Sequence, residues 1–127
     1  MSGIIMGAVT SVGGGGGGGT ITVTVFPDNA IGYTFGAGTG DTPNVTATAS
    51  GGTGPYTYVW GYYSGPDSDF IISNPSSATT HFTNTVGLNR QKYANYRVTA
   101  TDLYGNTGFA IIPVGIQDIT FSGGVTL

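Results

Sequence analysis

The chain has 127 residues, which suits a single domain, and 39% of them are hydrophobic, enough to build a core. Only 7% are charged, and three basic residues against six aspartates give a net charge of −3. So little positive charge argues against nucleic acid as a partner, and the lack of cysteine excludes disulfides and thiolate metal sites.

Residues 1–19 join an apolar peptide to a run of seven glycines, Gly13 to Gly19. The peptide lacks the basic start and the continuous apolar stretch of a secretory signal. No segment of the chain approaches the roughly 20 apolar residues of a membrane span. We therefore expect no membrane partner, and a protein that stays in the cytoplasm unless it leaves inside a larger particle.

The glycine run has two interpretations. Ordering seven glycine residues costs on the order of 10 kcal/mol of backbone entropy, comparable to the net stability of a whole domain. An ordered run therefore requires other surfaces that grip its backbone, as in an assembly. The alternative is a flexible linker without such contacts.

The rest of the chain reads as short strands of alternating apolar and polar residues, separated by turn residues. No segment has helical periodicity, and this spacing of strands and turns is typical of an all-β sandwich. Alternation places Ile21, Val23 and Val25 on the inner face of the first strand. The seven predicted strands are Thr20–Phe26, Asn44–Ser50, Tyr56–Tyr62, Asp69–Ser73, Thr79–Thr85, Tyr93–Asp102 and Thr107–Val114.

The aromatic residues divide into core and turn positions. Trp60, Tyr58 and Tyr96 belong to the core by strand alternation. Tyr63 and Tyr104 lie in predicted turns, and we expect the turns at 51–55, 74–77 and 103–106 to meet at one end of the sandwich. Tyr104 there is either a contact for a sugar or a host protein, or a side chain that folds back over the sandwich.

Candidate chemistry is sparse. His81 is the single histidine and lies in a strand pattern without a nucleophile elbow. The glycine run has no lysine beside it, which a phosphate-binding loop requires. Asp67 and Asp69 are close enough in sequence to hold Ca²⁺, but the EF-hand pattern is missing, and a solvated turn is the default. We expect no enzyme activity, no cofactor and no metal.

Three segments carry a resemblance to a known family. ASGGTGPYTYVW (Ala49–Trp60), NPSSATTHF (Asn74–Phe82) and YRVTATDLYGNTG (Tyr96–Gly108) resemble the bacterial Ig-like and PKD-like modules of tailed-phage structural proteins. The resemblance covers residues 20–115 and implies that Trp60 anchors the core. It also implies that Tyr96 occupies the tyrosine-corner position and that Val98 replaces the cysteine of antibody domains.

The expected fold is thus all-β, an Ig-like β-sandwich of about seven strands with an N-terminal glycine-rich extension. Residues 1–19 form an anchor peptide and polyglycine connector, residues 20–115 the sandwich, and residues 116–127 an extra C-terminal strand or tail. The resemblance implies a non-enzymatic structural protein of a tailed-phage virion, assembled in the host cytoplasm. Such a subunit decorates the capsid, or belongs to the tail surface or the baseplate.

The expected partners are other virion proteins and copies of the chain itself, contacted through its N-terminus. For the apolar residues of this peptide, the alternative is an additional edge strand on the same sandwich. The alternative function is a cell-surface or host-attachment module that recognises glycans through Tyr104. The candidate assembly residues are Ile4, Ile5, Met6, Val9, Val12, Gly13, Gly16 and Gly19.

Overall fold

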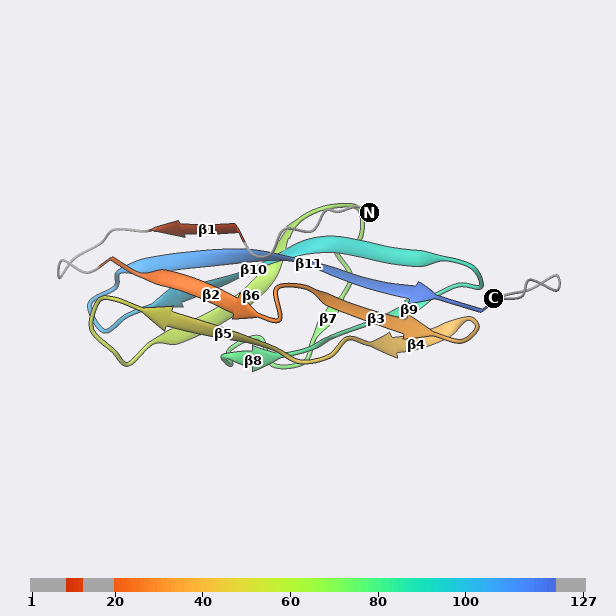
Figure 1. Cartoon of the computed structure of the whole chain (residues 1–127), viewed down its shortest axis with the longest axis horizontal. Coiled ribbons are helices and arrows are strands. Elements are labelled where there is room, and N and C mark those ends of the chain that lie inside the picture. Colours follow the sequence, from red (N-terminus) through yellow and green to blue (C-terminus); the bar gives the residue numbers. More distant parts are fainter. Residues whose placement is uncertain (1–8, 13–19, 121–127) are drawn as a thin grey trace.

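The computed structural model describes residues 9–12, by their backbone, and residues 20–120 with their side chains. Within these ranges the chain forms strands and turns, and it contains no helix long and apolar enough to cross a membrane. The strands run along the length of an elongated molecule (Figure 1). They are β1 (Val9–Val12), β2 (Thr22–Phe26), β3 (Ala30–Thr34), β4 (Gly38–Asp41), β5 (Val45–Ser50), β6 (Thr57–Ser64), β7 (Ile71–Ile72), β8 (Thr79–Thr80), β9 (Phe82–Val86), β10 (Gln91–Thr101) and β11 (Thr107–Asp118).

One layer of the molecule is built around β11. On one side β11 pairs with the full length of β10, whose other side pairs with β6. The opposite edge of β11 is shared by two strands. β1 pairs antiparallel with Gly108–Ile111, and β3 pairs in parallel with Val114–Asp118.

The other layer consists of two three-stranded sheets, in the orders β2-β5-β8 and β4-β9-β7. Only residues 42–44 separate β4 from β5, and only His81 separates β8 from β9. Thr42 bridges this break, since its amide donates to the Phe82 carbonyl at 2.8 Å and its hydroxyl accepts from the Phe82 amide at 3.0 Å. The two sheets therefore form a single face with a break across its middle.

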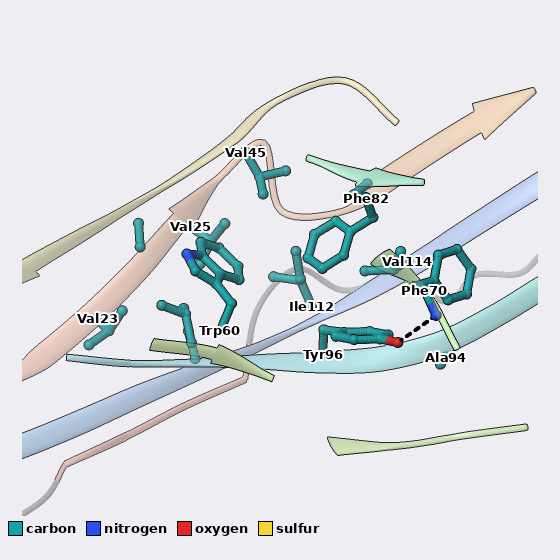
Figure 2. Packing of buried hydrophobic residues seen from close by; sticks show 14 of the residues in the cluster. Val23, Val25, Val45, Trp60, Phe70, Phe82, Ala94, Tyr96, Ile112 and Val114 are labelled. Atoms are coloured by element: carbon teal, nitrogen blue, oxygen red, sulfur yellow. Dashed lines mark hydrogen bonds between the residues drawn. The ribbon is translucent and has the colours of Figure 1, made fainter. Parts of the chain in front are cut away.

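The core lies between the two layers, as a β-sandwich requires (Figure 2). Ile21, Val23 and Val25 are buried as their alternation predicts, and Tyr58 is half-buried at the edge of the core. The remaining buried apolar residues are Ala30, Val45, Ala47, Trp60, Phe70, Phe82, Val86, Ala94, Tyr96, Val98, Ala100, Ala110, Ile112, Val114 and Ile116.

Trp60 is confirmed as a core residue, with 3% of its surface exposed. Its ring meets Phe82 of the opposite layer edge-on, at 6.0 Å between centroids and 77° between planes. The indole N–H donates to the Ser77 carbonyl at 2.7 Å, so the polar atom of this buried side chain is satisfied. Trp60 thus joins β6 to β9 and to the turn before β8.

The structure contains strands that alternation did not predict. Gly32 and Gly40 weaken the apolar pattern of residues 30–41, yet β3 and β4 form there. A Cβ at Gly32 would lie 2.2 Å from the Asp41 carbonyl oxygen, so glycine lets these two strands of opposite layers approach closely. With β1 and the split of Thr79–Thr85 into β8 and β9, the described residues hold eleven strands where the sequence predicted seven.

Two expected positions along the chain are also different. β11 continues to Asp118, so residues 116–118, the start of the expected extra strand or tail, are the last residues of this strand. The turn at 74–77 does not join the other two predicted turns at one end. It lies against the middle of β6, where the Trp60 amide donates to the Pro75 carbonyl at 2.8 Å.

Tyr96 and Tyr63 also occupy other environments than expected. The Tyr96 hydroxyl accepts a hydrogen bond from the Phe70 amide at 3.2 Å, 26 residues upstream (Figure 2). A tyrosine corner bonds to backbone only a few residues upstream, at the turn into its strand. Tyr96 is in the middle of β10, so it joins β10 to the segment before β7 instead. Tyr63 lies in β6 and not in a turn.

Candidate functional site

The residues considered for chemistry serve structural contacts. The backbone of His81 is held by Ser73, whose hydroxyl accepts from the His81 amide at 3.0 Å and whose amide donates to the His81 carbonyl at 2.9 Å. Within residues 20–120, no group of three His, Cys, Asp or Glu side chains is placed to hold a metal ion.

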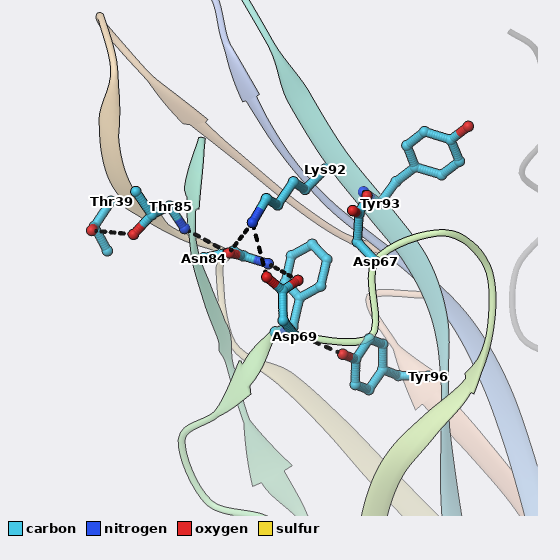
Figure 3. A network of polar contacts seen from close by, with 9 residues as sticks. Thr39, Asp67, Asp69, Asn84, Thr85, Lys92, Tyr93 and Tyr96 are labelled. Carbon is cyan, nitrogen blue, oxygen red and sulfur yellow. Dashed lines mark hydrogen bonds and ion pairs between the residues drawn. The ribbon is translucent and has the colours of Figure 1, made fainter. Parts of the chain in front are cut away.

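Asp67 and Asp69 each bind protein groups (Figure 3). Asp67 accepts a hydrogen bond from the Tyr93 amide at 2.8 Å. Asp69 forms an ion pair with Lys92 at 2.9 Å and accepts from the Asn84 amide group at 3.0 Å. The Lys92 ammonium, followed by Asn84, lowers the pKa of Asp69. This network fastens the segment between β6 and β7 to β9 and β10.

The outer edge of β11 is the first candidate interaction surface. β1 covers Gly108–Ile111 of this edge, in the register Val9 to Ile111 and Val12 to Gly108. The start of β2 lies against the same residue. A Cβ at Gly108 would lie 2.3 Å from the carbonyl oxygen of Ile21, the residue just before β2. β1 therefore takes an edge position beside the point where the chain enters the core at β2.

The turn between β10 and β11 is the second candidate surface. Asp102, buried at its base, accepts hydrogen bonds from the amides of Thr53, Tyr104 and Asn106, each at 2.9 Å. The Asn106 side chain and these amides lower the pKa of Asp102 to about 2. The clamp holds Leu103 and Tyr104 outward, with exposed fractions of 58% and 56%.

A second aspartate clamp lies at the opposite end of the β10–β11 hairpin. Buried Asp118 accepts from the amides of Asn89 at 2.7 Å, Gly36 at 2.8 Å and Thr120 at 2.8 Å. Those contacts, with the Asn89 amide first, hold the pKa of Asp118 well below its ordinary value. The turns at Gly36 and Asn89, which Asp118 holds, expose Phe35 and Leu88. Large apolar side chains are therefore exposed at both ends of the β10–β11 hairpin.

The outer face of the β3-β11-β10-β6 layer is aromatic. Arg97, at its centre on β10, lies over the rings of Tyr63 and Phe109 at 5.8 and 5.7 Å. Tyr93, 53% exposed, borders an open groove toward β3. Its apolar lining includes Ile31, Pro66, Pro113 and Val114.

Three of the predicted site residues, Tyr104, Val9 and Val12, lie within the described part of the chain, and the others lie outside it. Tyr104 lies in the clamped turn and is exposed, as a contact residue needs to be. Val9 and Val12 are in β1, whose end at Gly108 lies close to that turn. The other candidate assembly residues, Ile4, Ile5, Met6, Gly13, Gly16 and Gly19, are outside the described residues.

Sequence reasoning missed Phe35, Leu88 and Arg97. Phe35 and Leu88 stand beside glycines in turn-like segments, which was a usable signal for exposed apolar side chains. Arg97 alternates outward between buried Tyr96 and Val98, so its place on the outer face was predictable by parity.

No family model matches the chain, and no curated protein or solved structure matches it either. The functional interpretation therefore rests on the residues and their geometry.

Proposed function

We propose that the chain is a non-enzymatic structural subunit of a tailed-phage virion, built on an Ig-like sandwich and anchored by its N-terminal peptide. The observation that carries this proposal is the position of β1. It pairs at a sheet edge and is joined by seven glycines to a sandwich whose residues 20–120 already contain a buried cluster between two layers. An N-terminal peptide attached in this way suits a role between subunits.

Strand order supports the Ig-like part of the proposal. If β4 and β5 count as one broken strand, and β8 and β9 as another, one layer reads β2, β4/β5, β8/β9, β7. The other layer reads β6, β10, β11, with β1 and β3 sharing the outer edge of β11. Apart from the added edge strands β1 and β3, these orders match the ABED and CFG sheets of an immunoglobulin sandwich, and Trp60 on β6 matches the buried tryptophan of strand C, which supports the proposal. Tyr96, which makes no tyrosine corner, is the departure from that pattern.

The character of the surface supports an assembly role. Only 7% of the residues are charged, which leaves little electrostatic repulsion between neighbouring copies. The partners proposed are other virion proteins and further copies of this chain, with assembly in the host cytoplasm.

The test is incorporation into particles. A full-length Ile4→Asp, Ile5→Asp variant should be lost from purified virions, because charge in the peptide opposes its burial against a partner. A Thr22→Asp, Thr24→Asp variant, altered on the exposed face of β2, is the matched control and should still be incorporated. Equal incorporation of both variants, with unchanged melting, would reject the N-terminal anchor.

Glycan recognition at the β10–β11 turn is the second candidate function. The observation that favours it is the exposure of Tyr104 on a turn held by the Asp102 carboxylate, since a fixed aromatic ring is a good platform for a sugar. Binding on a glycan array that disappears in Tyr104→Ala and persists in Tyr33→Ala, another exposed tyrosine, would support it. Binding that is absent, or equal in both variants, would reject it.

A further inference from the structure

The edge of β11 between Gly108 and Ile111 is an apolar strand edge that needs a cover. Ala110 is buried, and Phe109 and Ile111 on the outer face are half-buried. An open edge of this composition presents unpaired N–H and C=O groups to any other strand. β10 fills one side of β11 and β3 reaches only Val114–Asp118, so β1 is the strand that covers this segment.

β1 itself has a simple attachment. It forms four residue pairs with β11, and seven glycines follow it before Thr20. Glycines offer no side chain that could fix β1 to one particular body. Covalent geometry lets seven residues extend to about 25 Å, so the length of the run does not restrict β1 to its own chain.

We propose that β1 is an exchanged strand: in the assembly, β1 of one copy pairs with the Gly108–Ile111 edge of a second copy. The exchange forms the same four pairs that β1 makes within its own chain, so it loses no contact. The strand that covers the β11 edge within one chain would thereby connect two subunits. The proposal rests on the assembly role argued above, for which it names the partner and the surface.

Concentration decides between the two pairings. A short linker presents its strand to its own chain at an effective concentration on the order of millimolar. In dilute solution β1 therefore pairs within its own chain. In a particle, where neighbouring copies are packed at comparable local concentration, pairing between copies competes. Edge strands that add to the sheet of another chain are an established mode of recognition.

The test uses the absence of cysteine from the chain. Ser11 and Phe109 are directly opposite in the register, which brings their Cβ atoms within about 4.5–5.5 Å, close to disulfide geometry. Full-length Ser11→Cys and Phe109→Cys proteins are mixed at micromolar and at millimolar concentration and oxidised mildly. A Ser11–Phe109 disulfide between two chains requires exchange. Val9→Cys with Ile111→Cys is a second pair, should the first variant fold poorly.

The expected result is a mixed dimer that exceeds both same-variant dimers and increases with concentration. The matched control mixes Ser11→Cys with Thr24→Cys, which is exposed on the other layer, and should give only statistical crosslinking. Equal crosslinking to Phe109→Cys and Thr24→Cys at millimolar concentration would overturn the proposal.

The length of the glycine run gives a second measurement. Deleting all seven glycines leaves only Thr20 between Val12 and Ile21, too short for the chain to reverse, and should therefore shift crosslinking between copies to micromolar concentration. A Gly/Ser run of the original length should behave as the parent. A shortened chain that stays monomeric at micromolar and at millimolar concentration would contradict exchange. Because the readout is in solution, it is independent of the virion incorporation that tests the proposed function.

Discussion

Trp60 connects the two layers through a single side chain. Its ring meets Phe82 of the opposite layer, and its N–H binds the Ser77 carbonyl. Without disulfides, the domain relies on such buried aromatic contacts.

Replacing Trp60 by alanine should lower the free energy of unfolding by about 3–5 kcal/mol, because the cavity left between the layers cannot close fully. Urea denaturation of parent and variant measures the difference. The control is Tyr33→Ala, an exposed aromatic truncation that should change stability by less than about 1 kcal/mol. A Trp60→Ala protein as stable as its parent would mean that the tryptophan is not a core anchor.

The strands differ in how far their sequence reveals them. β2, β5 and β10 alternate apolar and polar residues, and their inner faces were predictable, whereas β11 is apolar on both faces over Phe109–Val114. β3 and β4 were not predictable, because glycine occupies positions such as Gly32 where the layers approach too closely for any side chain. Close approach between layers is a tertiary property, and local alternation carries no signal for it.

Gly108 allows a test of such an approach at the junction of β1, β2 and β11. A Gly108→Ala methyl would fall 2.3 Å from the Ile21 carbonyl oxygen, a backbone atom that cannot move alone. We expect a loss of about 1–3 kcal/mol, typical of overpacking. Gly61→Ala is the matched control in β6, with no atom within 4 Å of the added methyl. Thermal melting of both compares them, and equal effects would show that the junction tolerates a side chain.

Across the whole molecule, Asp102 and Asp118 hold the two ends of the β10–β11 hairpin. The Asp102 turn was foreseeable, since an aspartate at the start of a turn such as Asp102-Leu-Tyr-Gly-Asn commonly binds the backbone of its own turn. Asp118 contacts turns that are distant in sequence, around Gly36 and Asn89. Those contacts depend on the assembled sandwich, so the clamp at that end, with Phe35 and Leu88, was beyond prediction from local sequence.

These clamps should make stability depend on pH under acidic conditions. Both pKa values are lower in the folded state than the ordinary aspartate value of 3.8. The stabilisation is therefore complete above about pH 4, and it is lost as pH falls toward about 2 for Asp102 and lower for Asp118. The urea concentration at the midpoint of unfolding should therefore decrease as the pH is lowered from 5 to 2.

The variant Asp118→Asn should flatten this pH dependence and be less stable at pH 6, because an amide offers one acceptor oxygen to three backbone donors. Asp28→Asn, at an exposed position between β2 and β3, should keep the parental slope. If the stability of Asp118→Asn depends on pH as strongly as that of the parent, Asp118 is not the group responsible for the pH dependence.

The two strands that share one edge of β11 will respond differently to mechanical force between the chain ends. β1 is antiparallel, so force entering at Val9 peels its four pairs with β11 one after another. β3 is parallel to β11, and its five pairs from Ala30 to Thr34 are loaded together in shear. A weak, sequentially opening contact thus precedes a stiff one. The N-terminal strand can detach under tension while the body of the sandwich stays closed.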